Sequence, residues 1–411
     1  MKEIKSLVEK NFDKAKDFLT EIIKFKSVSG EGEEKVGTFL YEKFSEFGEV
    51  NLVPISDDLK KDPEYAFGKT EFDYSKRKNM VLRFSPKGTG KSLILNSHMD
   101  VVSAENWQEA YSPKTEGDYL YGRGACDAKG QVASIYLALC VLKDLRVKLQ
   151  GELIVEIVIE EEVGGNGALA LIRQGYKADG VIVLEPTELE IKPANRGAIW
   201  FQIEIEGKPV HMGKIWKGVN AIEKTCYLMK VLREYEKKLI EESKNIPLFE
   251  KYKQPVQLNF GVIQGEGWPS MVCGKVILEG GVGFLPNKTL EQVKKELKDA
   301  IENCGDEWIK NHYKLSFNKL HNDSYTIGKD HPLVKVMEKA AEDSFLSSDV
   351  NGWIVSCDAR LFAKVGKMPV VVFGPGSLDD AHSNHEKIEL NQMKIASEVV
   401  TRAVINWCGR E

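Results

Sequence analysis

Short apolar segments that alternate with helical segments are the feature that most restricts the fold of this chain. Segments 130–145 and 391–407 have the length and residue pattern of helices. Four segments rich in Val, Ile and Leu are interpreted as buried strands: 92–97, 153–159, 180–184 and 368–373. Strands that are apolar on both faces require cover on both faces. The alternation therefore predicts an α/β fold, with a mostly parallel sheet between helices.

The residue pattern changes between residues 195 and 320. Three segments there alternate apolar and polar residues, which indicates half-buried antiparallel strands: 199–206, 256–263 and 275–285. Two long helices are expected beside them, at 220–243 and 289–310. The sequence thus predicts one domain formed by residues 1–194 and 321–411, interrupted by an inserted α+β domain at 195–320.

Charge and cysteine content exclude several classes of protein. The 411 residues carry a formal net charge of -5 and no basic tract, so nucleic acid is not an expected partner. The seven cysteines are scattered without a CxxC pair, which is typical of reduced thiols. No apolar segment is long enough to cross a bilayer, and no apolar targeting segment follows the charged residues 1–5. A soluble cytoplasmic protein that does not bind a membrane is expected.

Acidic residues and histidines follow four of the expected strands. His98 and Asp100 follow the first, residues 160–162 are all glutamates, and Glu185 and His382 follow the last two. In an open α/β sheet, ligands bind beyond the carboxyl ends of the strands. Taken singly, each residue is more often a solvated loop acid or a surface histidine. Taken together, in a chain with seven histidines, they favour a site.

The residue types indicate a metal centre. Asp100 lies on the same face of the strand as His98, and a metal-binding histidine normally gives its second ring nitrogen to a carboxylate. A glycine-rich segment adds Asp127. Histidines with several carboxylates suit zinc, cobalt or manganese, and two such ions activate a water and polarise a carbonyl. One of Glu161 and Glu162 can bind metal while the other acts as general base, because neighbours on an extended segment face opposite ways.

The motifs resemble those of the two-zinc metallopeptidase and deacylase family that includes aminoacylase, acetylornithine deacetylase, succinyl-diaminopimelate desuccinylase and glutamate carboxypeptidase. The match extends over nearly the whole chain. It is carried by six segments: 98–102, 121–130, 160–165, 185–187, 374–376 and 381–386.

The resemblance implies a ligand set for two divalent ions. Asp127 would bridge both ions, which are expected to be zinc, with cobalt or manganese as alternatives. His98 and Glu185 would complete one metal site, and Glu162 and His382 would complete the other.

Further roles follow from the same resemblance. Glu161 would be the general base, and the Asp100 carboxylate would orient His98. The inserted domain would be a lid and dimerisation domain, so a homodimer is expected. His211, in the Gly-Lys-x-x-His motif at 207–211, would reach the active site of the partner subunit and stabilise the developing oxyanion. Without that motif, His211 would be interpreted as a surface residue.

Substrate binding departs from the family pattern at Gly283. Many relatives carry an arginine there that grips the substrate carboxylate, so the classical amino-acid substrates of the family do not carry over directly. Arg360 could supply a substitute cation, since a guanidinium suits bidentate binding of a carboxylate. Alternatively, Arg360 forms a structural ion pair with Asp358.

The expected activity is that of a metal-dependent amidohydrolase acting on a small-molecule N-acyl or peptide substrate. Deacylases of the family tend to have Glu at the position of Glu185, whereas peptidases tend to have Asp. We therefore expect removal of an N-acyl group from an amino acid or a related amine. A dipeptidase or carboxypeptidase is the first alternative, and a non-catalytic metal-binding relative is the second. The presence of Glu161 argues against the latter, because a stability role gives no reason for an extra acid beside the ligands.

Overall fold

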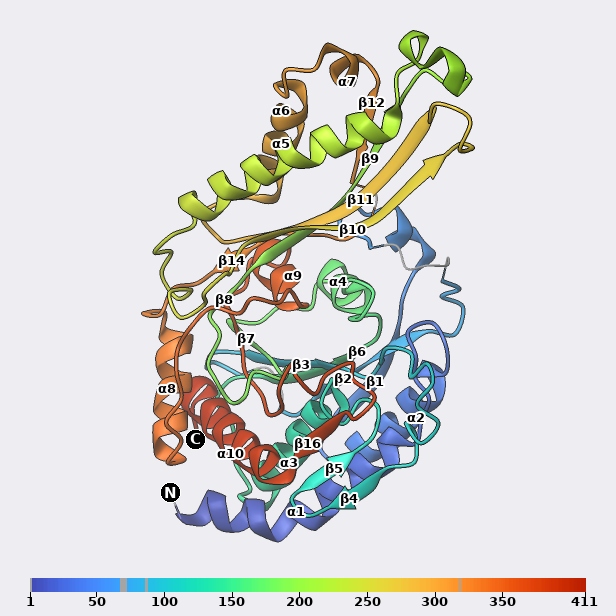
Figure 1. The fold of residues 1–411 in the computed structure, drawn as a ribbon. Helices are drawn as coiled ribbons and strands as arrows, with labels where there is room; N and C mark the ends of the chain where they lie inside the picture. Colours follow the sequence, from blue (N-terminus) through green and yellow to red (C-terminus); the bar gives the residue numbers. More distant parts are fainter. Residues whose placement is uncertain (1, 67–71, 86–87, 318) are drawn as a thin grey trace. The chain divides into compact units, whose positions relative to one another are not determined.

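A computed structural model of the chain describes residues 2–66, 72–85, 88–317 and 319–411 (Figure 1). The chain divides into two compact units. Unit 1 comprises Met1–Ala194, Ile327–Asn351 and Cys357–Glu411, and unit 2 comprises Asn195–Thr326 and Gly352–Ser356. The chain re-enters unit 1 after Thr326, whereas the sequence pattern predicted this domain boundary after residue 320. The difference arises because strand β13 (His321–Asn322) still pairs with strand β9 (Gly197–Glu206) of unit 2.

Unit 1 is built around a six-stranded sheet. Its strand order is β1 (Glu49–Pro54), β2 (Lys78–Arg83), β6 (Leu153–Val158), β3 (Leu93–His98), β7 (Gly180–Val183) and β15 (Val370–Val372). The last four strands are parallel, and β1 and β2 add an antiparallel edge. Every residue of the four parallel strands is buried, as expected of a sheet with cover on both faces. The expected fold class, a mostly parallel α/β sheet, is confirmed.

Helices cover both faces of this sheet (Figure 1). Helices α3 and α10 lie on one face, where α1 packs against α3, and α4 and α9 lie on the other. Helix α3 is buried from its first residue to Leu142, in agreement with the mostly apolar sequence of residues 132–142. The bounds of the helices of unit 1 are α1 (Lys2–Ile23), α2 (Glu33–Phe44), η1 (Asp57–Lys61), α3 (Lys129–Asp144), α4 (Asn166–Arg173), α8 (Pro332–Asp343), α9 (Ala359–Lys364) and α10 (Leu390–Cys408).

A small antiparallel sheet lies beside the main sheet of unit 1. It consists of β16 (Lys387–Glu389), β5 (Tyr119–Tyr121) and β4 (Lys114–Glu116). This small sheet fixes the start of the segment between β5 and α3, and that segment carries Asp127. In the part of the chain that the structure describes, no helix has both the length and the apolar character needed to cross a membrane.

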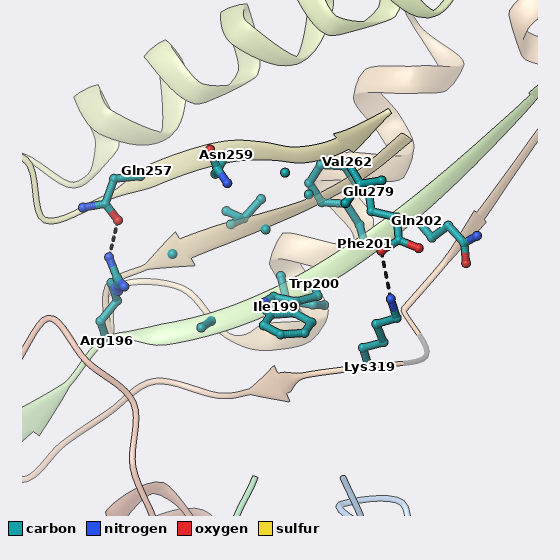
Figure 2. A pocket seen from close by; sticks show the side chains of 16 residues that line it. Arg196, Ile199, Trp200, Phe201, Gln202, Gln257, Asn259, Val262, Glu279 and Lys319 are labelled. Atoms are coloured by element: carbon teal, nitrogen blue, oxygen red, sulfur yellow. Dashed lines mark hydrogen bonds and ion pairs between the residues drawn. The ribbon is translucent and has the colours of Figure 1, made fainter. Parts of the chain in front are cut away.

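Unit 2 is an antiparallel sheet with helices on one face (Figure 1). Its strands lie in the order β10 (Gln257–Glu266), β11 (Lys275–Phe284), β9 and β12 (Tyr313–Ser316), and the short β13 also pairs with β9. Along β9, alternate residues from Ile199 to Ile205 are buried, and the residues between them are not. The buried face packs against α5 (Ala221–Glu242) and α6 (Leu290–Glu302), and the other face carries a pocket of about 410 Å³ (Figure 2).

The single helix expected at 289–310 is wrong, because two helices occupy this segment. Helix α6 begins with a capping box between Thr289 and Gln292 and ends at Glu302. Gly305 then adopts a φ of 80°, in the left-handed region that glycine tolerates best. Asp306 starts α7 (Glu307–Asn311) by accepting hydrogen bonds from the next free backbone amides. The helical residue spacing continues across this break, so the spacing alone did not reveal it.

Candidate metal centre

Five residues from five separate segments of unit 1 form two overlapping groups of potential metal ligands. The parallel strands β3, β6 and β7 end at the same edge of the sheet, and His98, Glu162 and Glu185 lie at or just after these ends. Asp127 comes from the segment between β5 and α3, and His382 from the segment between β15 and β16. The ligand atoms of His98, Asp127 and Glu185 all lie within 4.8 Å of one another, and so do those of Asp127, Glu162 and His382.

Asp127 is shared by the two groups through different oxygens. Its Oδ1 lies 3.0 Å from His98 Nε2, which in turn lies 3.9 Å from Glu185 Oε1. Its Oδ2 lies 3.2 Å from His382 Nε2, and the same nitrogen lies 3.0 Å from Glu162 Oε2. This is the geometry of a carboxylate that can bridge two ions.

Carboxyl groups outnumber imidazoles in this cluster. Burial, followed by the charge of Asp127, raises the pKa of Glu162 to about 7. Hydrogen bonds with Asp127 and Glu162 raise the pKa of His382 to about 10. The cluster contains two imidazoles, His98 and His382, and five carboxyl groups, Asp100, Asp127, Glu161, Glu162 and Glu185. Imidazole nitrogens together with several carboxyl oxygens fit divalent cations of the zinc type.

Asp100 contacts both His98 and the acidic turn, which is formed by Glu160, Glu161 and Glu162. The ring Nδ1 of His98 lies 2.9 Å from the main-chain oxygen of Asp100 and 3.5 Å from its Oδ1. The carbonyl can only accept, so Nδ1 carries a proton. Nε2 faces Asp127 Oδ1 and is the ring atom available to a metal ion. The Asp100 carboxylate accepts hydrogen bonds from Ser29 Oγ at 2.5 Å and from the backbone amides of Glu161 and Glu162 at 3.3 Å each. Asp100 therefore connects the first histidine to the acidic turn.

Glu160 anchors the same turn from the other side. Its φ of 63° lies in the left-handed region, and its side chain is buried. The Glu160 carboxylate accepts hydrogen bonds from Tyr74 at 2.8 Å and Asn166 at 2.7 Å, and it forms an ion pair with Arg77. Glu160, the first of the three consecutive glutamates, therefore has a structural role. Glu161 belongs to neither ligand group, and burial, followed by the charge of Glu185, raises its pKa well above the ordinary value.

Two buried acids near the ligands were not assigned a role in the metal centre from the sequence. Glu386 Oε1 accepts the backbone amides of Cys126 and Asp127, each at 2.9 Å, and its Oε2 accepts from Arg123 at 2.7 Å. Glu386 therefore fixes the position of the shared ligand. Asp358 is also buried, burial raises its pKa to about 7, and neither carboxylate oxygen has a hydrogen-bond partner among the described residues. Glu386 lies in the segment 381–386 that resembles a family motif, and this position could have identified it from the sequence. The sequence around Asp358 offered no comparable signal.

Neither alternative for Arg360 matches its surroundings. Its guanidinium forms an ion pair with Glu64, 3.1 Å between Nη1 and Oε2, and donates to the carbonyl of Gly164 at 3.0 Å. Its side chain is 3% exposed. The expected pair with Asp358 is corrected to a pair with Glu64. Because its donors are used inside unit 1, Arg360 is assigned a structural role and not that of a substrate-binding cation.

His211 lies in unit 2, at the start of the 3₁₀ helix η2 (Met212–Lys217). Its Nδ1 accepts the backbone amide of Gly213 at 3.1 Å, and its side chain is exposed. Because Nδ1 accepts, the neutral ring carries its proton on Nε2. An exposed N–H donor with a fixed ring orientation is the property that an oxyanion-binding histidine requires.

Comparison with known proteins identifies related sequences and a related fold. Residues 94–406 match peptidase family M20/M25/M40, a range that includes all five candidate ligands. The chain is 28% identical over 354 residues to N-formyl-4-amino-5-aminomethyl-2-methylpyrimidine deformylase of Bacillus subtilis, covering 78% of this chain and 80% of that protein. It is 29% identical over 342 residues to acetylornithine deacetylase of Salmonella heidelberg, covering 81% and 85%. The structure of aminopeptidase PepT from Bacillus cereus superposes with a TM-score of 0.76 at 22% identity, covering 96% of this chain and 98% of that one.

Proposed function

The chain belongs to peptidase family M20/M25/M40, and from this premise we propose that it is a metal-dependent amidohydrolase that removes an N-acyl group from an amino acid or a related amine. The observation that carries the proposal is the pair of ligand groups that share Asp127. When bound, two divalent ions at such a centre supply an activated water and polarise the carbonyl of the substrate.

The five ligand candidates divide between two ions in the proposal. His98 and Glu185 hold one ion, Glu162 and His382 hold the other, and Asp127 bridges them. Zinc is the proposed metal, since imidazole and carboxylate ligands suit it, with cobalt or manganese as substitutes.

Glu161 is proposed as the general base. It belongs to neither ligand group, yet it directly precedes the ligand Glu162. It takes a proton from the attacking water as the water oxygen bonds to the acyl carbon, and it delivers that proton to the amine nitrogen as the C–N bond breaks. The products are a carboxylate and a free amine, with no other reactant required.

Two lines of support favour an acyl compound over a peptide. Glu185 matches the deacylase pattern, and both sequence relatives named above are described as enzymes that remove a formyl or acetyl group. A dipeptidase or carboxypeptidase is the competing proposal. All seven cysteines are present as thiols, six of them buried, and this supports the reducing environment of the cytoplasm.

The function is tested by measuring amine release with mass spectrometry. The panel contains N-formyl, N-acetyl and N-succinyl amino acids, N-acyl amines and dipeptides, each with added zinc or cobalt and with a chelator. We expect chelator-sensitive release from acyl compounds and no cleavage of dipeptides. Cleavage of dipeptides alone would establish the competing proposal. Cleavage that resists the chelator would contradict the metal centre.

A homodimer formed through unit 2 is proposed from its exposed apolar side chains. Ile263 of β10 and Ile222 of α5 are 53% and 46% exposed, and a Cβ atom at Gly265 of β10 would lie 3.7 Å from Ile222, so the two side chains lie on adjacent elements. Neighbouring apolar side chains of this kind are typical of a surface that another protein covers. In the proposed dimer, His211 donates to the oxyanion in the site of the partner subunit.

Mixing two inactive variants tests this sharing. His211→Ala should lower kcat by about 10²- to 10³-fold, because one oxyanion donor is lost. Random pairing of His211→Ala chains with Glu161→Ala chains should restore roughly a quarter of wild-type activity, since half of the dimers then contain one complete site. The control mixes Glu161→Ala with a chain that carries both substitutions, and no rescue is expected there. Absence of rescue in the first mixture would mean that His211 does not act on the partner subunit.

A further inference from the structure

A ring of polar contacts within unit 1 joins the start of helix α2 to the acidic turn. In one half of the ring, Ser29 Oγ donates to the Asp100 carboxylate at 2.5 Å. Asp100 in turn accepts the backbone amides of Glu161 and Glu162. This half therefore connects the segment that leads into α2 with the backbone of the turn.

The other half of the ring runs through Arg77, which directly precedes strand β2. Its Nε and Nη2 donate to the carboxylate of Glu33, the first residue of α2, at 2.9 and 2.7 Å. Its Nη1 forms an ion pair with Glu160, and its guanidinium lies 4.4 Å from the centre of the Phe72 ring. All three charged side chains are buried. In the described part of the chain, no second cation pairs with Glu33 or Glu160. Arg77 is thus the link between α2 and the side chain of the turn.

Glu160 is held at both of its oxygens. Oε1 faces Arg77, and Oε2 accepts from Tyr74 Oη at 2.8 Å and from Asn166 Nδ2 at 2.7 Å. The amide of Asn166 is itself fixed, because it exchanges two hydrogen bonds of 2.9 Å with the backbone of Ala66. The Glu160 carboxylate therefore has one position in which all of these donors are satisfied.

The backbone of Glu160 depends on this support. Its φ of 63° is unfavourable for a residue with a side chain, and such a conformation persists where the surroundings hold it. The carbonyls of Glu160 and Glu161 accept the amides of Gly165 and Gly164 at 2.8 and 2.9 Å, which closes the turn. Glu161 is the next residue, so its orientation follows from the conformation of Glu160.

We propose that Arg77 and Tyr74 are positioning residues for the reaction. By holding Glu160, they keep the acidic turn in the conformation that directs Glu161 toward its task as general base. This inference rests on the proposed function of Glu161. It adds two residues that lie outside all six segments of the family resemblance. Precise placement matters because a displacement of about 1 Å can lower a rate about 100-fold.

Tyr74→Phe is the mildest test, since it removes one hydroxyl and keeps the ring. We expect kcat to fall about 10- to 100-fold, the range for loss of a hydrogen bond to a charged group, with KM and metal per chain within about twofold of the wild type. Tyr136→Phe is the matched control. Tyr136 also donates to a glutamate, Glu46 at 2.8 Å, but has no contact with the acidic turn, so wild-type kcat is expected. Wild-type kcat in Tyr74→Phe would overturn the inference.

A double variant distinguishes positioning from a general effect on the fold. In the Glu161→Gln background, Tyr74→Phe should not lower the residual kcat further, because the base that it positions is absent. A second fall of the same size would show that Tyr74 acts in another way and would overturn its role.

The conservative variant of Arg77 gives the corresponding test. Arg77→Lys keeps the positive charge but loses the paired donors to Glu33, so kcat should fall less than in Arg77→Met, with KM unchanged. Wild-type kcat in both variants would contradict a role of Arg77.

Hydrogen exchange separates this inference from the proposed function, since it requires no substrate. In zinc-loaded protein, Tyr74→Phe should make the backbone amides of residues 160–165 exchange about 10- to 100-fold faster, while those of α10 keep the wild-type rate. Faster exchange in a protein that cleaves no compound of the panel would support the positioning of the turn, and the proposed function would fail alone. Unchanged exchange in the acidic turn would overturn the inference whatever the activity.

Discussion

Replacing Glu161 with glutamine should lower kcat by about 10²- to 10⁴-fold, the contribution expected of a general base, while bound metal stays at the wild-type level. Glutamine keeps the size of the side chain but cannot take a proton from water. Glu161 lies outside both ligand groups, so its loss leaves all five candidate ligands in place. The measurement combines kcat on the best substrate of the acyl panel with metal per chain by mass spectrometry.

The neighbouring residue supplies the matched control for this prediction. Glu162 contributes an oxygen to the ligand group of Asp127 and His382. Glu162→Gln is therefore expected to lower metal content as well as activity, whereas Glu161→Gln lowers activity alone. If Glu161→Gln kept more than about a tenth of the wild-type kcat, another group would have to be the base.

Replacing Asp127 with asparagine should reduce the metal content at both sites and lower activity by more than about 100-fold. The reason is that each oxygen of Asp127 faces a different group, Oδ1 toward His98 and Oδ2 toward His382. An asparagine side chain has no negative charge and only one carbonyl oxygen, so it cannot bridge two cations. Metal per chain after dialysis against a weak chelator is the decisive measurement.

Two control variants are needed to interpret the metal content of Asp127→Asn. His382→Ala removes a ligand of one group only, so one ion per chain should remain, whereas Asp127→Asn should approach none. Asp118→Asn, an exposed acid just before β5, controls for the loss of one negative charge and should bind metal like the wild type. Two ions retained in Asp127→Asn would refute its role as the bridging ligand.

The main sheet and the place of the site were accessible from local sequence patterns. Strands β3, β6 and β7 are buried along their whole length, so their apolar segments identify them without knowledge of their neighbours. Parallel strands end at one edge, and the residues that follow them are therefore close together. This explains why His98, Glu162 and Glu185 could be placed in one site before any contact was known.

The tertiary structure decided which partner each charged side chain binds. Arg360 pairs with Glu64, 296 residues away, and not with the nearby Asp358. Glu386 holds the backbone of Asp127 across 259 residues.

By itself, the sequence of this protein determined the α/β fold class, because hydrophobic periodicity is a local property of the chain. It also determined the residue types available for a metal centre. Only the tertiary structure decided that Arg77 joins Glu33 to Glu160, that Glu160 turns away from the ligands, and that Arg360 is a structural residue. The physical reason is that a long side chain takes the partner that packing brings within hydrogen-bond distance, and packing depends on segments that are remote in sequence.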